Sequence, residues 1–248
     1  MPKTFKFFIR IIGDFVLNIT YYKDLRPNNI TSPKYRHLLL LIYWIIFGIA
    51  FRLLEMWGAP NGNGFGHRDF VAIEWPAVDN AIPFCEIFLI PYLFWFIYIV
   101  GMHLYTLVRD IEGFKKYMWV IILTYTFCAL VYLVFPNKQE LRPADFERDN
   151  FLTRFMAGFY NFDTNTNVFP SIHVTGSLAV HFALWNDKYF SKPIWRVIFT
   201  IITTSICAST VFLKQHSILD VFPAVAISFL SYYLVYKVKL FDRFFKSK

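Results

Sequence analysis

The stretch PFCEIFLIPYLFWFIYIVGMHLYTLV, residues 83–108, indicates which kind of fold the chain adopts. It contains one charged side chain, Glu86, and is otherwise dominated by aliphatic and aromatic residues. A helix needs roughly 17–25 apolar residues to cross about 30 Å of hydrocarbon, and this stretch meets that length. It therefore predicts a membrane-spanning helix.

Similar apolar runs recur along the chain. Hydrophobic residues make up 56% of it and aromatic residues 21%, which leaves too few polar side chains to cover a soluble globule. We predict an all-α fold, a polytopic membrane helical bundle that forms one domain at residues 37–240. Its six expected transmembrane helices are residues 37–54, 83–108, 118–135, 171–185, 194–213 and 218–238.

The segment that precedes the first span, residues 1–36, has a different pattern. Lys6, Arg10 and Asp14 are spaced four residues apart, and hydrophobic residues fill the positions between them. This pattern is typical of an amphipathic helix that lies in the membrane interface. We predict such a helix on the cytoplasmic side and no cleaved signal peptide, because charges interrupt the apolar run.

Basic residues give the chain a formal net charge of +8, and they gather at the ends of the apolar runs. Of the 25 Lys and Arg residues, 18 fall on the side that carries both termini, six fall on the other side, and Arg52 lies in the first span. Cytoplasmic loops are enriched in these residues, so both termini are expected to be cytoplasmic. Topology accounts for the charge, and we do not expect a nucleic-acid partner.

The three cysteines, Cys85, Cys128 and Cys207, all lie within apolar runs. None belongs to a Cys-x-x-Cys pair or to a Cys/His spacing that suits zinc. The sequence therefore predicts no disulfide framework, no metal site and no cofactor.

Two histidines stand out on the side opposite the termini. His216 and Asp220 are four residues apart at the start of the last span, so they share a helix face and the carboxylate can orient the imidazole. His173 lies in the first turn of the fourth span, where it can protonate a leaving group. By contrast, His181 lies about 12 Å deeper along the same helix, and we assign it to bundle packing.

Cations and a hydroxyl accompany these histidines on the same side. Arg142 and Lys214 are candidates for binding phosphate oxygens, and Lys138 is a third. Ser171 stands at the start of the fourth span, where a helix N-terminus offers unpaired backbone N–H groups to an anion. The site predicted at residues 136–220 is therefore suited to a phosphate.

In these positions the sequence resembles the type 2 phosphatidic acid phosphatase superfamily, which also includes sphingomyelin and inositol phosphorylceramide synthases. That family carries Lys-x6-Arg-Pro, Pro-Ser-Gly-His and Ser-Arg-x5-His-x3-Asp motifs on a six-helix membrane core. The matching positions here are Arg142-Pro143, Pro170-Ser171-Ile172-His173, and Ser209, His216 and Asp220.

The resemblance implies that His216 is a nucleophile that forms a phosphohistidine, that Asp220 orients it and that His173 is the general acid. Three positions depart from the motifs. Lys138 lies four residues before Arg142, where the family has seven, Ile172 replaces a glycine, and Thr210 replaces an arginine.

Three functions stay open at this point. The first is a lipid phosphatase that acts on a lipid phosphate or pyrophosphate at the extracytoplasmic face. The second is a lipid phosphotransferase that passes a phospho-headgroup to an alcohol. The third is a transporter or a non-catalytic membrane protein that binds lipid, but the sequence has no inverted repeat and its polar residues gather at one surface, which favours an enzyme.

Overall fold

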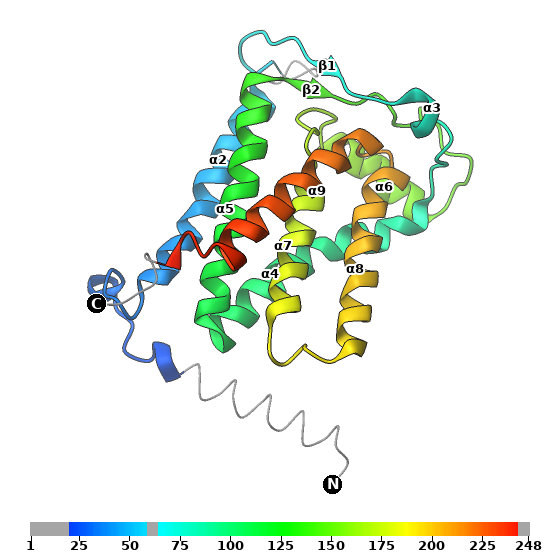
Figure 1. Cartoon of the computed structure of the whole chain (residues 1–248). Coiled ribbons are helices and arrows are strands. Elements are labelled where there is room, and N and C mark those ends of the chain that lie inside the picture. Colours follow the sequence, from blue (N-terminus) through cyan, green and yellow to red (C-terminus); the bar gives the residue numbers. More distant parts are fainter. Residues whose placement is uncertain (1–19, 59–63, 243–248) are drawn as a thin grey trace.

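The computed structural model of the chain describes residues 20–58 and 64–242. Within them, five helices are long and apolar enough to cross a membrane (Figure 1). They support the prediction of an integral membrane helical bundle. They are Arg36–Met56, made of η3 (Arg36–Leu41) and α2 (Ile42–Met56); Glu86–Arg109, made of η4 (Glu86–Phe88) and α4 (Leu89–Arg109); α5 (Ile111–Val134); α8 (Pro193–Phe212); and Ile218–Lys237, made of α9 (Ile218–Tyr232) and η5 (Tyr233–Lys237).

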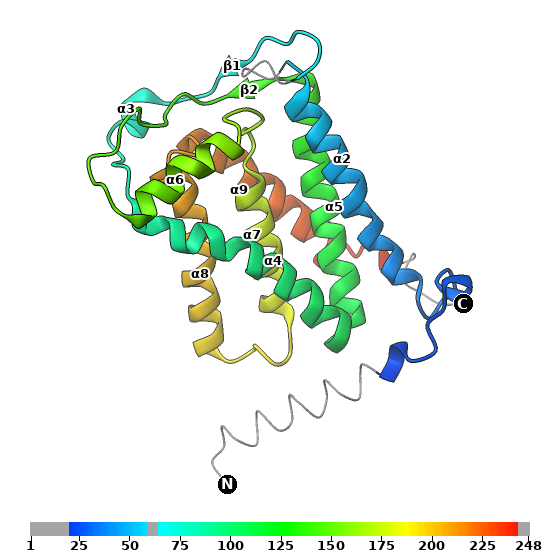
Figure 2. The same cartoon turned by 180° about the vertical axis from the view of Figure 1, so that it is seen from behind.

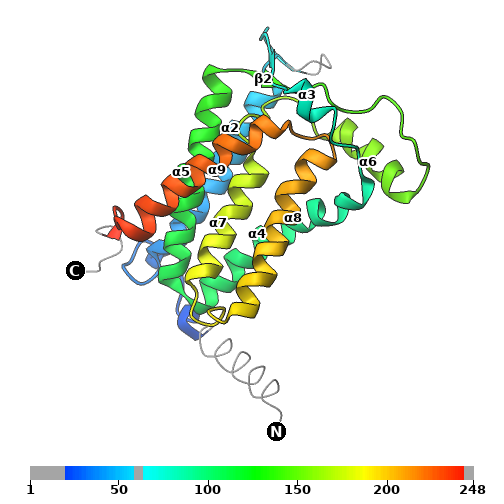
Figure 3. The same cartoon turned by 45° about the vertical axis from the view of Figure 1, so that its right-hand side comes forward.

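The fourth predicted span corresponds to α7 (Ile172–Asn186), which lies in the middle of the bundle (Figures 1 and 3). It packs against α4, α5, α8 and α9, and most of its side chains are buried. Its 15 residues rise about 22 Å at 1.5 Å per residue, less than the roughly 30 Å of a hydrocarbon core. A sixth crossing through α7 therefore stays a prediction.

Short elements gather at one end of the bundle (Figures 1 and 2). A two-residue strand β1 (Val71–Ala72) pairs in parallel with β2 (Asn137–Lys138), and α3 (Pro76–Asp79) follows β1. The all-α prediction did not include this ladder, because two-residue strands are too short to give a periodic signal. The opposite end of the bundle carries the connection between α7 and α8.

The long loop predicted at residues 136–170 contains a further helix, α6 (Phe151–Phe162). Asn150 begins it, because its side chain accepts hydrogen bonds from the backbone N–H groups of Leu152 and Thr153. The Thr153 hydroxyl accepts the Asn150 N–H in return, which completes a capping box. The helix was missed because its 12 residues are too few for a span.

The segment before the first span is described only from Thr20 onward. It begins with two short 3-10 helices, η1 (Thr20–Tyr22) and η2 (Pro27–Asn29). Tyr22 joins this segment to the bundle, since its hydroxyl donates to the carbonyl of Leu107 at 2.8 Å. The predicted interfacial helix with Lys6, Arg10 and Asp14 lies outside the described residues.

Two buried tyrosines of α5 fix the beginning of α7. The Tyr132 hydroxyl donates to the carbonyl of Pro170 at 2.5 Å, and the Tyr125 hydroxyl donates to the carbonyl of Ile172 at 3.3 Å. Both side chains are almost fully buried. The helix that carries His173 is therefore held at its first turn by its neighbour.

Candidate active site

The turn between α8 and α9 presents His216. Lys214 adopts a left-handed backbone conformation with φ of 52°, which ends α8 and reverses the chain. The backbone N–H groups of Gln215 and His216 both donate to the Thr210 carbonyl at 3.0 Å. This compact turn sets the imidazole of His216 at the entrance of α9.

His216 and Asp220 form the pair that the sequence predicts. Nδ1 of His216 lies 3.0 Å from Oδ2 of Asp220, and both side chains are buried. A carboxylate only accepts hydrogen bonds, so Nδ1 carries the proton and Nε2 keeps its lone pair. Asp220 also accepts the backbone N–H of Ser217 at 3.1 Å, which fixes the carboxylate.

A second carboxylate, Asp79, supports this turn from α3. It is fully buried and accepts the backbone N–H of Ile218 at 2.9 Å and the hydroxyl of Ser217 at 2.6 Å. It also accepts the backbone N–H of Trp75 at 2.7 Å. A negative charge at a helix N-terminus is stabilising, and here it orders the first turn of α9. Sequence reasoning missed Asp79 because nothing in its loop marks it as buried.

His173 lies across from His216 in the first turn of α7. The centroids of the two imidazole rings are 5.8 Å apart. Two aromatic side chains of α4 flank His173, with ring centroids at 4.6 Å for Tyr92 and 4.4 Å for Trp95. The predicted pair of histidines is therefore brought together, and α4 contributes two contacts that the sequence did not indicate.

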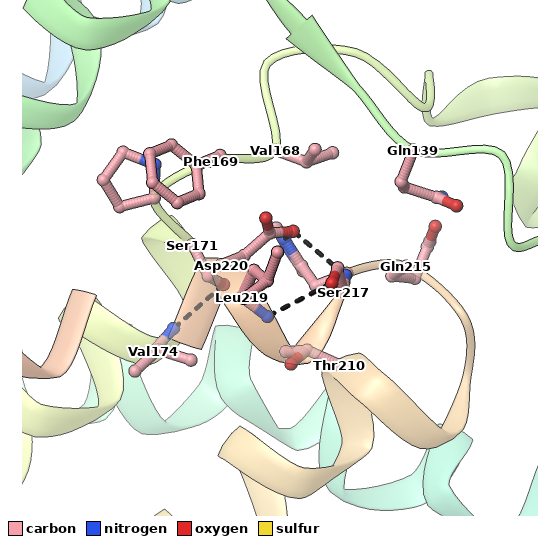
Figure 4. Close-up of polar contacts among 12 residues, drawn as sticks. Gln139, Val168, Phe169, Ser171, Val174, Thr210, Gln215, Ser217, Leu219 and Asp220 are labelled. Carbon is pink, nitrogen blue, oxygen red and sulfur yellow. Dashed lines mark hydrogen bonds and ion pairs between the residues drawn. The ribbon is translucent and has the colours of Figure 1, made fainter. Parts of the chain in front are cut away.

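Ser171 joins the start of α7 to the first turn of α9 (Figure 4). Its backbone N–H donates to the Asp220 carbonyl at 3.1 Å, and its hydroxyl accepts the Val174 N–H at 3.4 Å as the N-cap of α7. The first backbone hydrogen bond of α7 runs from the Thr175 N–H to the Ser171 carbonyl. The backbone N–H groups of Ile172 and His173 precede it, so they have no intrahelical acceptor. Ser171 orders this helix end, and its own hydroxyl serves as the cap.

Arg142 lies beside the turn between α8 and α9, and most of its N–H donors are already hydrogen-bonded. Its Nη1 donates to the carbonyls of Tyr160 and Asp163 at 3.0 and 2.8 Å. Its Nη2 donates to the carbonyl of Thr164 at 2.8 Å and to the side-chain oxygen of Gln215 at 2.6 Å. Burial lowers the pKa of this guanidinium, and the neighbouring Asp163 raises it. Arg142 thus supplies a fixed positive charge, and of its five N–H donors only Nε–H is left for a ligand.

Asp163 brings a carboxylate close to the same place. Its Oδ2 accepts the side-chain N–H of Gln215 at 3.1 Å. Burial raises the pKa of Asp163, while the charges of Arg142 and His216 lower it. Gln215 therefore connects Arg142 to Asp163 directly before the His216 position.

The two predicted lysines have other partners. The Lys138 ammonium lies 2.5 Å from Glu140 in a partly exposed ion pair. The Lys214 ammonium donates to the carbonyls of Asp79 and Ile82, both at 2.5 Å. Burial lowers the pKa of Lys214, and Asp79 raises it. In this structure the two lysines stabilise loops, and Arg142 is the predicted cation that contacts Gln215 beside the histidines.

Five buried polar atoms of these residues have no hydrogen-bond partner within the described part of the chain. They are Tyr92 Oη, Trp95 Nε1, Arg142 Nε, His173 Nδ1 and Asp220 Oδ1. A buried polar group without a partner costs about 1–3 kcal/mol, so such groups are rare unless a function requires them. Their concentration around one pair of histidines marks the place where a polar ligand is expected.

We compared the chain with models of known protein families, with curated proteins and with solved structures, and none of them matches it.

Proposed function

We propose that the chain is a membrane-embedded lipid phosphatase that removes a phosphate from a lipid phosphate or pyrophosphate at the extracytoplasmic face. The observation that carries this proposal is the 3.0 Å contact between His216 and Asp220, with the ring of His173 5.8 Å away from that of His216. Such an arrangement supplies an oriented nucleophile and a separate acid. The motif resemblance adds support, and the distribution of Lys and Arg favours cytoplasmic termini.

In the first half-reaction, Nε2 of His216 attacks phosphorus. The N–P bond forms while the P–O bond to the lipid alcohol breaks, and the leaving oxygen takes a proton from protonated His173. Asp220 holds the Nδ1 proton and stabilises the positive charge that develops on His216. A phosphate dianion beside His173 favours the protonated imidazole, since an opposite charge stabilises the charged form.

In the second half-reaction, His173 takes a proton from the acceptor. With water as the acceptor, the new P–O bond forms while the N–P bond breaks, and inorganic phosphate leaves. The electron pair of the broken bond returns to Nε2 of His216, which restores the starting state.

The phosphate is expected to bind at the first turn of α7. The backbone amides of Ile172 and His173 point toward the helix N-terminus, where a partial positive charge favours anions. Arg142 adds a full charge and one N–H donor. Both features act on the negative charge that shifts toward the phosphoryl oxygens during transfer.

A phosphotransferase is the second candidate, and Gln215 is the observation that favours it. The residue directly before His216 is polar and joins Arg142 to Asp163. A carboxylate with a raised pKa near the nucleophile can accept a hydrogen bond from an acceptor alcohol. Both candidates share the first half-reaction and differ in the acceptor.

The decisive experiment is turnover of a panel of lipid phosphates by detergent-purified protein in EDTA. We expect His216→Ala to lose about 10³-fold or more in kcat, and His173→Ala about 10²–10⁴-fold, because each removes a separate chemical role. His181→Ala is the matched control, since it removes an imidazole from the same helix as His173, where its Nδ1 lies 3.4 Å from the Thr203 hydroxyl.

The products separate the candidates. Free phosphate that depends on both histidines supports the phosphatase. A new phospholipid with little free phosphate supports the transferase. Turnover that survives in both histidine variants, or none on any lipid, contradicts an enzyme of this mechanism.

A further inference from the structure

A groove of about 450 Å³ runs between α2 and α4, in the size range of ligand pockets. Its lining residues on α4 are adjacent pairs that recur every four positions from Trp95 to Leu107, and η3 and α2 close the other side. Along its floor, Trp95, Ile99 and His103 are buried, whereas Val100 and Leu104 on its rim are more than half exposed. The groove therefore opens sideways, toward the hydrocarbon of the bilayer.

The groove presents a mostly apolar surface, although three side chains with polar ring atoms line it, Trp44, Trp95 and His103. The Trp44 indole N–H donates to Nε2 of His103 at 2.8 Å. The other ring nitrogen of His103, Nδ1, donates to the carbonyl of Ile99 at 2.7 Å. The polar atoms of Trp44 and His103 are therefore paired, while the Trp95 indole N–H, at the end beside His173, has no partner among the described residues. Away from Trp95 the groove suits hydrocarbon better than a headgroup.

Trp95 connects this groove to the candidate active site. Its side chain lines the groove, and its ring centroid lies 4.4 Å from that of His173. From Trp95 the groove follows α4 to Leu107, a distance of about 18 Å at 1.5 Å per residue.

We infer that this groove holds one hydrocarbon chain of the lipid whose phosphate reacts at His216, so that the substrate is a full-length lipid. This inference rests on the proposed function. The hydrocarbon chain enters from the bilayer beside α4. The Trp95 side chain, which contacts both the groove and His173, sets the distance between the hydrocarbon chain and the phosphate. Because lipid tails are already in hydrocarbon, the groove contributes orientation of the substrate more than affinity.

A chain-length series tests the inference. Measured along the axis of α4, Val100 lies about 7.5 Å and Leu104 about 13.5 Å from Trp95. We expect Leu104→Trp to reduce kcat/KM about 10-fold for long-chain lipid phosphates and to spare short-chain ones, because it displaces only chains that reach its depth. Val100→Trp is expected to affect shorter chains as well.

The second apolar groove provides a matched control. It measures about 430 Å³, lies between α2 and α5, and includes the exposed Leu130. Leu130→Trp makes the same substitution on a similar rim, in a groove whose lining includes neither Trp95 nor another residue in ring contact with His173. It is expected to leave the chain-length profile unchanged.

Two readouts separate failure of the groove from failure of the proposed function. A water-soluble phosphate monoester reports the chemistry without a chain, and Leu104→Trp should leave its turnover unchanged. A photoreactive long-chain phosphatidate should label α4 between Phe96 and Leu107 even in His216→Ala. The groove assignment would be overturned if Leu104→Trp and Leu130→Trp changed kcat/KM for long-chain lipids equally, or if the label appeared elsewhere. In either case turnover of the soluble monoester would still support the proposed function. If the parent protein turns over neither the soluble monoester nor the lipid phosphates in a histidine-dependent way, the proposed function is refuted instead.

Discussion

At the scale of single residues, we expect Asp163 to make phosphate binding at the proposed site sensitive to pH. Burial raises the pKa of Asp163, so this carboxyl stays neutral to higher pH than a free aspartate. Once pH rises through that raised pKa, a negative charge appears beside the bound phosphate and repels it. The stability contributed by neutral Asp163 is likewise present at low pH and lost over the same rise.

We therefore expect Asp163→Asn to flatten the pH dependence of KM. In the parent protein, KM for a lipid phosphate should increase as Asp163 ionises, and the neutral amide should abolish that increase. The measurement is a series of KM values across pH with kcat recorded in parallel. A variant whose KM follows the parental pH profile would exclude this role for Asp163.

Asp79 is expected to matter for stability, although it does not touch the histidines. In Asp79→Asn, an amide N–H would face donors that now bind a carboxylate, and we expect a loss of about 2–4 kcal/mol. The apparent Tm in detergent should fall accordingly. Asp69→Asn is the control, because that side chain lies in the same loop and is 94% exposed; equal Tm changes in both variants would contradict the assignment.

At this scale the sequence predicted the pair His216 and Asp220 and the approach of His173, because four-residue spacing and membrane sidedness both have a simple geometry. It did not predict Asp79, Asp163 or Tyr92. Their roles depend on which loop or helix folds over the site, and that is a property of tertiary packing. Lys138 and Lys214 are held by local partners, a carboxylate for Lys138 and backbone carbonyls for Lys214.

At the scale of elements, Gly176 on α7 marks a place where α4 and α5 pack closely against α7. A Cβ atom at this position would lie 2.6 Å from the Tyr125 hydroxyl and 3.2 Å from Nε1 of Trp95. The absence of a side chain thus lets α4 and α5 approach α7 one turn below His173.

We expect Gly176→Ala to destabilise the protein by about 1–3 kcal/mol, since an extra methyl in a packed core forces neighbours to move. Displacement of Trp95 should also lower kcat, because Trp95 contacts His173. The matched control is Gly101→Ala on α4, where an added Cβ meets nothing within 4 Å among the described residues. The measurements are Tm and kcat of both variants. Unchanged values for Gly176→Ala would contradict the close packing of α4 and α5 against α7 at this residue.

Element prediction succeeded where apolar runs are long. The boundary of α5 shows the usual error: the helix begins at Ile111, seven residues before the expected start, because Asp110 caps it by accepting the Gly113 N–H at 3.0 Å. Charged residues in the first turns had hidden this beginning. The helix α6 and the β1–β2 ladder escaped because short amphipathic pieces resemble loops in sequence.

At the scale of the whole molecule, the proposed chemistry and the proposed membrane access lie on different elements. α7 and the turn between α8 and α9 carry the two histidines, whereas α4 carries Trp95 and most of the groove lining. The site can therefore keep its reactive geometry while lipid selectivity changes along α4. This division explains why one sequence pattern reported the chemistry and no pattern reported the lipid.

The four hydrogen bonds of Arg142 have a consequence for the thermodynamics of binding. A free arginine side chain loses about 2 kcal/mol of rotamer entropy when it becomes ordered. Here that loss occurs during folding, since the carbonyls of residues 160–164 already immobilise the guanidinium. An arriving phosphate meets a preorganised cation, so its association should carry a smaller entropic penalty than binding to a flexible surface arginine.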